Sequence, residues 1–97
     1  MNGLGWCVGL GCTALFAATA FAQDGAQLSQ SKGCMTCHDV SQQKMGPSFK
    51  AIAASNKGKA DAQARLVGAL KSGSGHVKVD ATDAELQQIV AYVLATP

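Results

Sequence analysis

Charged side chains are scarce in this chain of 97 residues, and what the sequence lacks rules out several kinds of function. Asp, Glu, Lys and Arg make up only 14% of the residues, and the formal net charge is +2. So weak a basic bias argues against a nucleic-acid-binding protein. The sequence also lacks a phosphate-binding glycine loop, a nucleophile–base pair and, beyond residue 22, any strand-like run rich in Val, Ile and aromatic residues. These absences indicate a helical protein that is not an enzyme.

The first 22 residues contain no Asp, Glu, Lys or Arg, and they end in Ala20-Phe21-Ala22. A long apolar run that closes on a small-x-small pattern is typical of a secretory signal peptide. We therefore predict a signal peptide in residues 1–22 and a single domain in residues 23–97. The segment before the apolar run carries only the terminal amine as positive charge, and residues 4–22 are nearly long enough to span a bilayer. An uncleaved membrane anchor stays open as the alternative.

The main candidates for a functional site lie in the pentapeptide Cys34-Met35-Thr36-Cys37-His38. A C-x-x-C-H motif is typical of covalent haem attachment, in which each thiol forms a thioether to one vinyl group of the haem. The imidazole that follows then lies against one face of the macrocycle and can bind iron through Nε2. Its other ring nitrogen needs an acceptor that fixes the tautomer. We predict thioethers at Cys34 and Cys37, His38 as the proximal iron ligand, and one covalent haem c.

Three other uses of a C-x-x-C pair are weaker. A thioredoxin-like redox pair belongs in a βαβ unit, for which no strand is predicted. A structural zinc site needs four ligands, and the domain offers only Cys34, Cys37, His38 and His76, two of which are adjacent. A disulfide across two residues closes too small a loop to stabilise the chain much.

In the rest of the domain, the pattern of apolar and helix-breaking residues predicts short helices over residues 26–32, 48–55 and 60–72. A fourth helix is predicted to begin after Thr82. Thr82 and Glu85 have the spacing of a capping box. The apolar residues that follow recur at helical spacing and form one stripe, Leu86, Ile89, Val90, Val93 and Leu94. The expected fold class is therefore all-α.

Three segments, residues 32–38, 44–49 and 82–94, resemble a small bacterial class I cytochrome c over essentially the whole domain. The resemblance implies three to four short helices around one covalently bound haem. It also implies that the carbonyl of Pro47 accepts the N–H of the proximal histidine, and that Gly33 lies where the first and last helices cross.

The segment between the third and last helices, residues 73–81, departs from that family because it contains no methionine. In the family a methionine of this loop is usually the second iron ligand, and His76 stands at the corresponding position. We predict His76 as the distal ligand. The alternatives are a solvent-facing His76 that leaves the iron open or water-bound, and Lys78, which would first have to lose its proton. Met45 matches a position that does not bind iron in the family, and Met35 is expected to point out of the attachment motif.

The predicted function is that of a periplasmic carrier of one electron, with redox proteins of the periplasm as partners and membrane contact only through an uncleaved N-terminal segment. A homodimer or heterodimer stays open. Two further functions are kept as alternatives: binding or sensing of a small ligand such as NO or CO, and a haem subunit of a heteromeric redox complex. The haem is expected to be buried by apolar side chains, namely Phe49, Ile52, Leu66, Leu70, Leu86 and Val90.

Overall fold

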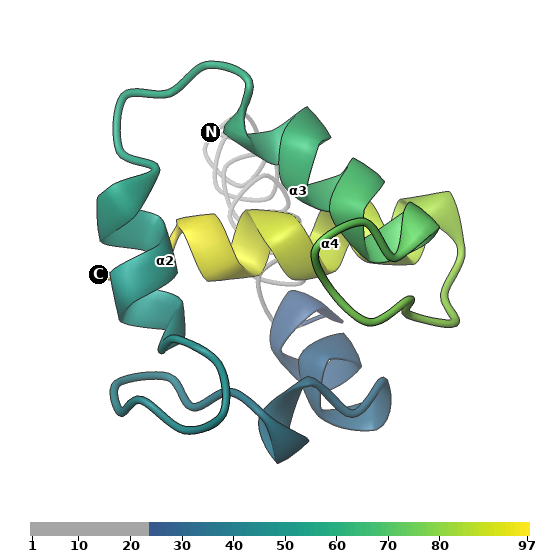
Figure 1. Cartoon of the computed structure of the whole chain (residues 1–97), viewed down its shortest axis with the longest axis horizontal. Helices are drawn as coiled ribbons and strands as arrows, with labels where there is room; N and C mark the ends of the chain where they lie inside the picture. Colours follow the sequence, from purple (N-terminus) through teal and green to yellow (C-terminus); the bar gives the residue numbers. More distant parts are fainter. Residues whose placement is uncertain (1–23) are drawn as a thin grey trace, which may run out of the picture.

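The computed structural model describes residues 24–97, so the predicted signal peptide and its cleavage site lie outside the described residues. Within residues 24–97 the regular structure is entirely helical, which confirms the predicted all-α class. The elements are an N-terminal helix over residues 24–31, a short 3₁₀ turn η1 (Cys34–Thr36), and helices α2 (Phe49–Ser55), α3 (Ala62–Ser72) and α4 (Asp83–Leu94) (Figure 1).

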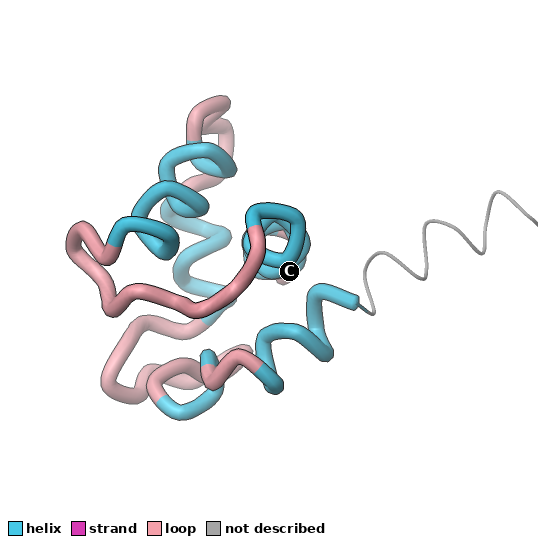
Figure 2. The backbone as a smooth tube through the Cα atoms, turned by 90° about the vertical axis from the view of Figure 1, so that its right-hand side faces the viewer, coloured by secondary structure: helices cyan, strands magenta, loops and turns pink. Residues whose placement is uncertain are grey.

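Helix α4 runs through the middle of the domain, with α2, α3 and the N-terminal helix arranged around it (Figures 1 and 2). Two of its side chains, Ile89 and Val93, form one buried cluster with Phe49 of α2. Leu86 and Val90 form a second cluster with Val67 of α3. Because residues three and four apart share a helix face, a single apolar stripe of α4 supplies both clusters. The core therefore depends on the last helix of the chain.

The start of α4 is fixed by the predicted capping box. The Thr82 backbone N–H donates to Oε1 of Glu85 over 2.9 Å, and the Glu85 N–H donates to Oγ1 of Thr82 over 3.2 Å. The Thr82 N–H, and to a lesser extent the nearby Lys32 ammonium, lower the pKa of the Glu85 carboxyl. Lys32 lies 3.5 Å from the same carboxylate oxygen. The cap thus also ties α4 to the end of the N-terminal helix.

The N-terminal helix crosses α4 at Gly25, and the prediction that Gly33 occupies this crossing is wrong. A Cβ at Gly25 would lie 2.6 Å from the carbonyl oxygen of Gln88 and 2.6 Å from Cβ of Tyr92, whereas a Cβ at Gly33 would meet nothing within 4 Å. Gly33 is needed instead for its left-handed backbone, with φ of 83°. The reason for the error is that Gly33 comes after the end of the helix that does the crossing.

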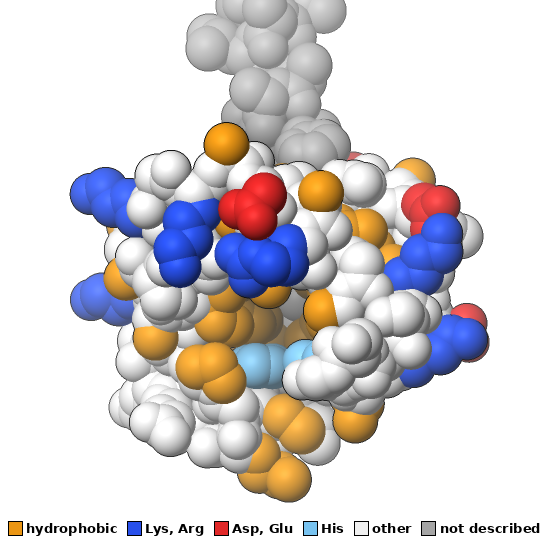
Figure 3. Space-filling model, turned by 45° about the horizontal axis from the view of Figure 1, so that its top comes forward, with side chains coloured by type: hydrophobic (Ala, Val, Ile, Leu, Met, Phe, Trp, Pro, Cys, Tyr) orange, Lys and Arg blue, Asp and Glu red, His pale blue; other side chains and the backbone are white. Residues whose placement is uncertain are grey.

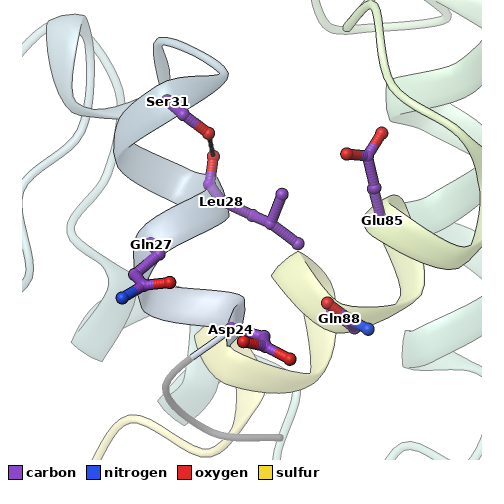
Figure 4. Close-up of a pocket in the computed structure, with 6 residues that line it drawn as sticks. All are labelled: Asp24, Gln27, Leu28, Ser31, Glu85 and Gln88. Atoms are coloured by element: carbon purple, nitrogen blue, oxygen red, sulfur yellow. Dashed lines mark hydrogen bonds between the residues drawn. The ribbon is translucent and has the colours of Figure 1, made fainter.

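Beside this crossing, the N-terminal helix and α4 leave a polar groove of about 410 Å³. Leu28 points across it toward α4, as Figure 4 shows, and five polar side chains line the rest. None of them is a predicted site residue. A second cavity, of about 600 Å³, lies along the α2–α3 turn and the C-terminus and also contains none of the predicted site residues. In the described part of the chain no helix has the length and apolar character needed to cross a membrane.

Candidate haem site

The two thiols and the first imidazole lie on one tight turn. Gly33, in the left-handed conformation, ends the N-terminal helix and starts η1. The backbone N–H groups of Cys37 and His38 both donate to the carbonyl of Cys34, over 3.3 and 3.0 Å. Both cysteines are half-buried free thiols. Burial raises the pKa of the Cys34 thiol above its ordinary value.

His38 is held by contacts from residues that follow it in the chain. Its Nδ1 lies 2.6 Å from the carbonyl oxygen of Pro47, which is the partner that the sequence suggested. Gly46 lies against the same ring, because a Cβ there would be 2.5 Å from Cε1. The Phe49 ring, with its centroid 5.6 Å from that of the imidazole, packs at a tilt of 33°. The imidazole therefore has one orientation and little room to leave it.

The loop that brings Gly46 and Pro47 back to His38 is closed by backbone hydrogen bonds. Gly46 N–H donates to the carbonyl of Cys37 over 2.8 Å, and Phe49 N–H donates to the carbonyl of Asp39 over 2.9 Å. The Asp39 carboxylate also accepts from the backbone N–H groups of Ser41 and Gln42, each over 2.9 Å. These two donors lower the pKa of Asp39. An ionised Asp39 thus shapes the turn that follows the proximal histidine.

His76 lies opposite His38, although 38 residues separate them in the sequence. The two imidazole planes are parallel within 2°, and their centroids are 6.0 Å apart. Figure 3 shows both histidines in a hollow bordered by hydrophobic side chains. Nδ1 of His76 lies 2.7 Å from the carbonyl oxygen of Val77. The structure therefore brings together the two histidines that the sequence marked as candidate ligands.

The two hydrogen bonds to carbonyl oxygens require the same tautomer of both rings. A carbonyl oxygen can only accept a hydrogen bond, so Nδ1 carries the proton in His38 and in His76. In a neutral imidazole with Nδ1 protonated, Nε2 holds the free lone pair. Each histidine thus presents the nitrogen that can bind a metal, and each has its outer nitrogen tied to the backbone, as metal-bound histidines usually do.

The spacing of the rings fits a haem iron between them. For two imidazoles whose Nε2 atoms both face one iron, a metal–nitrogen bond of about 2 Å and about 1 Å from nitrogen to ring centre on each side span about 6 Å. The centroid separation of 6.0 Å matches that span. A haem held there would supply a one-electron Fe(III)/Fe(II) couple. Among residues 24–97, no three His, Cys, Asp or Glu side chains gather as they would for a structural zinc ion.

The remaining candidates lie less favourably. Met45 is 86% exposed, and Met35 packs on the cluster that contains Phe49. Lys78 is as exposed as His76, but its ammonium would first have to lose its proton. The expected haem lining also needs correction, since Leu86 is 0% exposed and Phe49 and Val90 are each 2% exposed without any haem. The rest of the protein already buries these three side chains, so they have almost no exposed surface with which to contact a haem.

The half-buried leucines Leu66 and Leu70 remain available to line the site.

Two contacts were not predicted from the sequence: the packing of Gly46 on the imidazole and the Val77 carbonyl at His76. The adjacent Gly-Pro pair signalled the first contact, whereas a neighbouring backbone carbonyl leaves no trace in the residue pattern.

Comparison with known proteins agrees with this site. The family model described as cytochrome c matches residues 22–97. The chain is 35% identical over 86 residues to cytochrome c-552 of Hydrogenobacter thermophilus, an alignment that covers 81% of this chain and 86% of the relative. It is 40% identical over 60 residues to cytochrome c-551 of Pseudomonas aeruginosa, with 62% and 58% covered.

Solved structures give the same result. The class 1 cytochrome MtoD of Sideroxydans lithotrophicus superposes with a TM-score of 0.66 at 27% identity, covering 76% of this chain and 94% of MtoD. Wild-type cytochrome c552 of Nitrosomonas europaea gives 0.63 at 29% identity, with 74% and 99% covered. Members of this family bind one covalent haem c. The family match over nearly the whole domain, the C-x-x-C-H turn and the helical fold agree, and the chain belongs to the cytochrome c family.

Proposed function

We propose that His38 and His76 are the two axial ligands of the haem iron, and that Cys34 and Cys37 hold the haem by thioether bonds. The chain is a single-haem electron carrier, as its relatives are. The single observation that carries the ligand proposal is the pair of parallel imidazoles 6.0 Å apart. The protonated Nδ1 atoms support it, since both Nε2 atoms are then free to bind iron.

A second imidazole in place of a methionine thioether changes the redox couple. Axial ligand identity is a main control on haem potential, and methionine with histidine raises that potential. Imidazole ligation favours the ferric state, so this carrier should have a lower potential than methionine-ligated relatives. It would therefore exchange electrons with a different set of redox partners.

We further propose that the chain works in the periplasm, delivered by a signal peptide in residues 1–22, and that it transfers electrons without catalysing a reaction of its own. The apolar first 22 residues support export because they resemble a signal peptide. The C-x-x-C-H motif supports it as well, since the chain shares it with a family of c-type cytochromes. Its partners would be periplasmic redox proteins.

The test is a set of spectra of the holoprotein made with the haem-attachment machinery. We expect low-spin iron in the ferric and ferrous states, by visible absorption and by electron paramagnetic resonance. His76→Ala should turn the ferrous form high-spin and let CO bind at a rate proportional to its concentration. Val77→Ala is the matched control, because this neighbour is 74% exposed and its backbone carbonyl is kept. A His76→Ala protein whose spectra equal those of the wild type would refute His76 ligation.

A wild-type ferrous form that is already high-spin would instead favour the binding or sensing of a small ligand such as NO or CO. The exposure of residues 74–78, which carry His76, is the observation that keeps this second function in view.

A further inference from the structure

The two histidines are held in different ways. His38 contacts Pro47, nine residues along the chain, and Phe49 on α2. Within residues 24–97 the His76 ring makes one hydrogen bond, with the carbonyl of the next residue, Val77. That bond moves with the ring and ties it to no other element. The position of the distal imidazole is therefore set by the backbone of its own loop.

That loop is attached near its ends, where the Ser74 N–H also donates to Oγ of Ser72 over 3.3 Å. Gly73 N–H donates to the carbonyl of Ala69, and Val79 N–H donates to the carbonyl of Leu70, each over 2.9 Å. Between these anchors, residues 74–78 are all exposed. No side chain of this stretch belongs to either buried cluster. In the described part of the chain no hydrogen bond links residues 75–78 to another element, so backbone conformation directs the middle of the loop toward His38.

Gly75 is the residue directly before the imidazole, and its φ is 73°. A Cβ at this position would meet nothing within 4 Å, so crowding is not the reason for a glycine here. The left-handed backbone is the reason, because side chains with a Cβ disfavour it. We propose that Gly75 is a positioning residue for the distal ligand: its left-handed conformation aims His76 at the iron. This inference rests on the proposed function, in which His76 is that ligand.

A purely structural role for Gly75, closing the turn after α3, is the competing explanation. Gly58 offers a matched control, because its φ is 78° and a Cβ there would also meet nothing within 4 Å. Gly58 lies in the turn between α2 and α3, away from both histidines in the sequence. Alanine at either position introduces the same backbone strain. Only at Gly75 can release of the imidazole relieve it.

The experiment compares holoproteins carrying Gly75→Ala and Gly58→Ala. The strain of a left-handed conformation at a residue with a Cβ changes the equilibrium between iron-bound and released His76 by about 5- to 30-fold. We expect Gly75→Ala to raise the His76-free fraction by that factor, seen as faster CO uptake by the ferrous form at one CO concentration. Gly58→Ala should lower the melting temperature and leave CO uptake at the wild-type rate. Gly75→Asn should stay closer to the wild type than Gly75→Ala, because asparagine tolerates the left-handed region.

Wild-type CO uptake in Gly75→Ala would overturn the proposal, as would equal acceleration in both alanine variants. If His76 is not a ligand at all, His76→Ala and the wild type will take up CO alike. That result removes the proposed function itself and is distinct from a failure at Gly75 alone.

Discussion

Gly25→Ala should destabilise the protein because the new methyl group has no room at the helix crossing. Its Cβ would lie 2.6 Å from the Gln88 carbonyl oxygen and from Tyr92 Cβ, and ordinary contact begins at 3.4 Å. The two helices must therefore separate by about 0.8 Å, the difference of those distances. Neither contact atom is the end of a flexible side chain, so the cost falls at the upper end of the overpacking range, about 3 kcal/mol.

Alanine also has a higher helix propensity than glycine, by about 0.8–1 kcal/mol. The net loss is about 2 kcal/mol, which for a domain of this size lowers the melting temperature by about 8–16 °C. Thermal unfolding of the holoprotein, followed by circular dichroism at the helical band, measures the shift.

Gly68→Ala is the control in which only propensity acts. Gly68 lies inside α3, and a Cβ there would meet nothing within 4 Å. The same substitution should raise the melting temperature by about 4–8 °C. Opposite signs at Gly25 and Gly68 support the crossing argument. A Gly25→Ala protein as stable as the wild type, or more stable, would refute it.

Three further outcomes follow from contacts already described. Thr82→Ala removes one half of the capping box and should cost about 1 kcal/mol in urea unfolding; an unchanged midpoint would show that the cap is not needed. The pKa of Glu85 is lower in the folded protein than its ordinary value of 4.5, so its carboxylate stabilises the fold above that pH, and the contribution is lost as pH falls through the folded pKa. Glu85→Gln should flatten this acid limb of a stability–pH curve, and an acid limb identical to that of the wild type would contradict the assignment. Gly46→Ala puts a Cβ 2.5 Å from Cε1 of His38 and should turn the ring, which electron paramagnetic resonance of the ferric protein would detect as shifted g-values; identical spectra would mean that the loop yields instead.

Features that depend on residues close together in the chain were predicted correctly from the sequence. The capping box needs only Thr82 and Glu85 three residues apart, and the turn of Cys34 to His38 needs only its own spacing. The helical stripe of α4 repeats within 12 residues. Each of these features could be predicted because its partners are neighbours in the chain.

Features that depend on how helices meet were harder to predict. The sequence does not show whether Gly25 or Gly33 contacts α4. Only the way the N-terminal helix crosses α4 shows that Gly25 does. Leu86 belongs to the apolar stripe in either case, but its complete burial by other helices depends on packing that periodicity does not reveal. The parallel orientation of His38 and His76 likewise arises from two loops that are distant in sequence.

The central place of α4 has a consequence for how the chain matures. Both buried clusters draw on α4, and the N-terminal helix rests on it at Gly25. Contacts between the two ends of a chain form only after both ends are free to meet. A chain emerging from a ribosome cannot assemble this core until α4 has appeared. Until then Cys34 lacks Ile89 and Val93, on whose cluster it packs in the folded domain, so its thiol is more accessible for haem attachment.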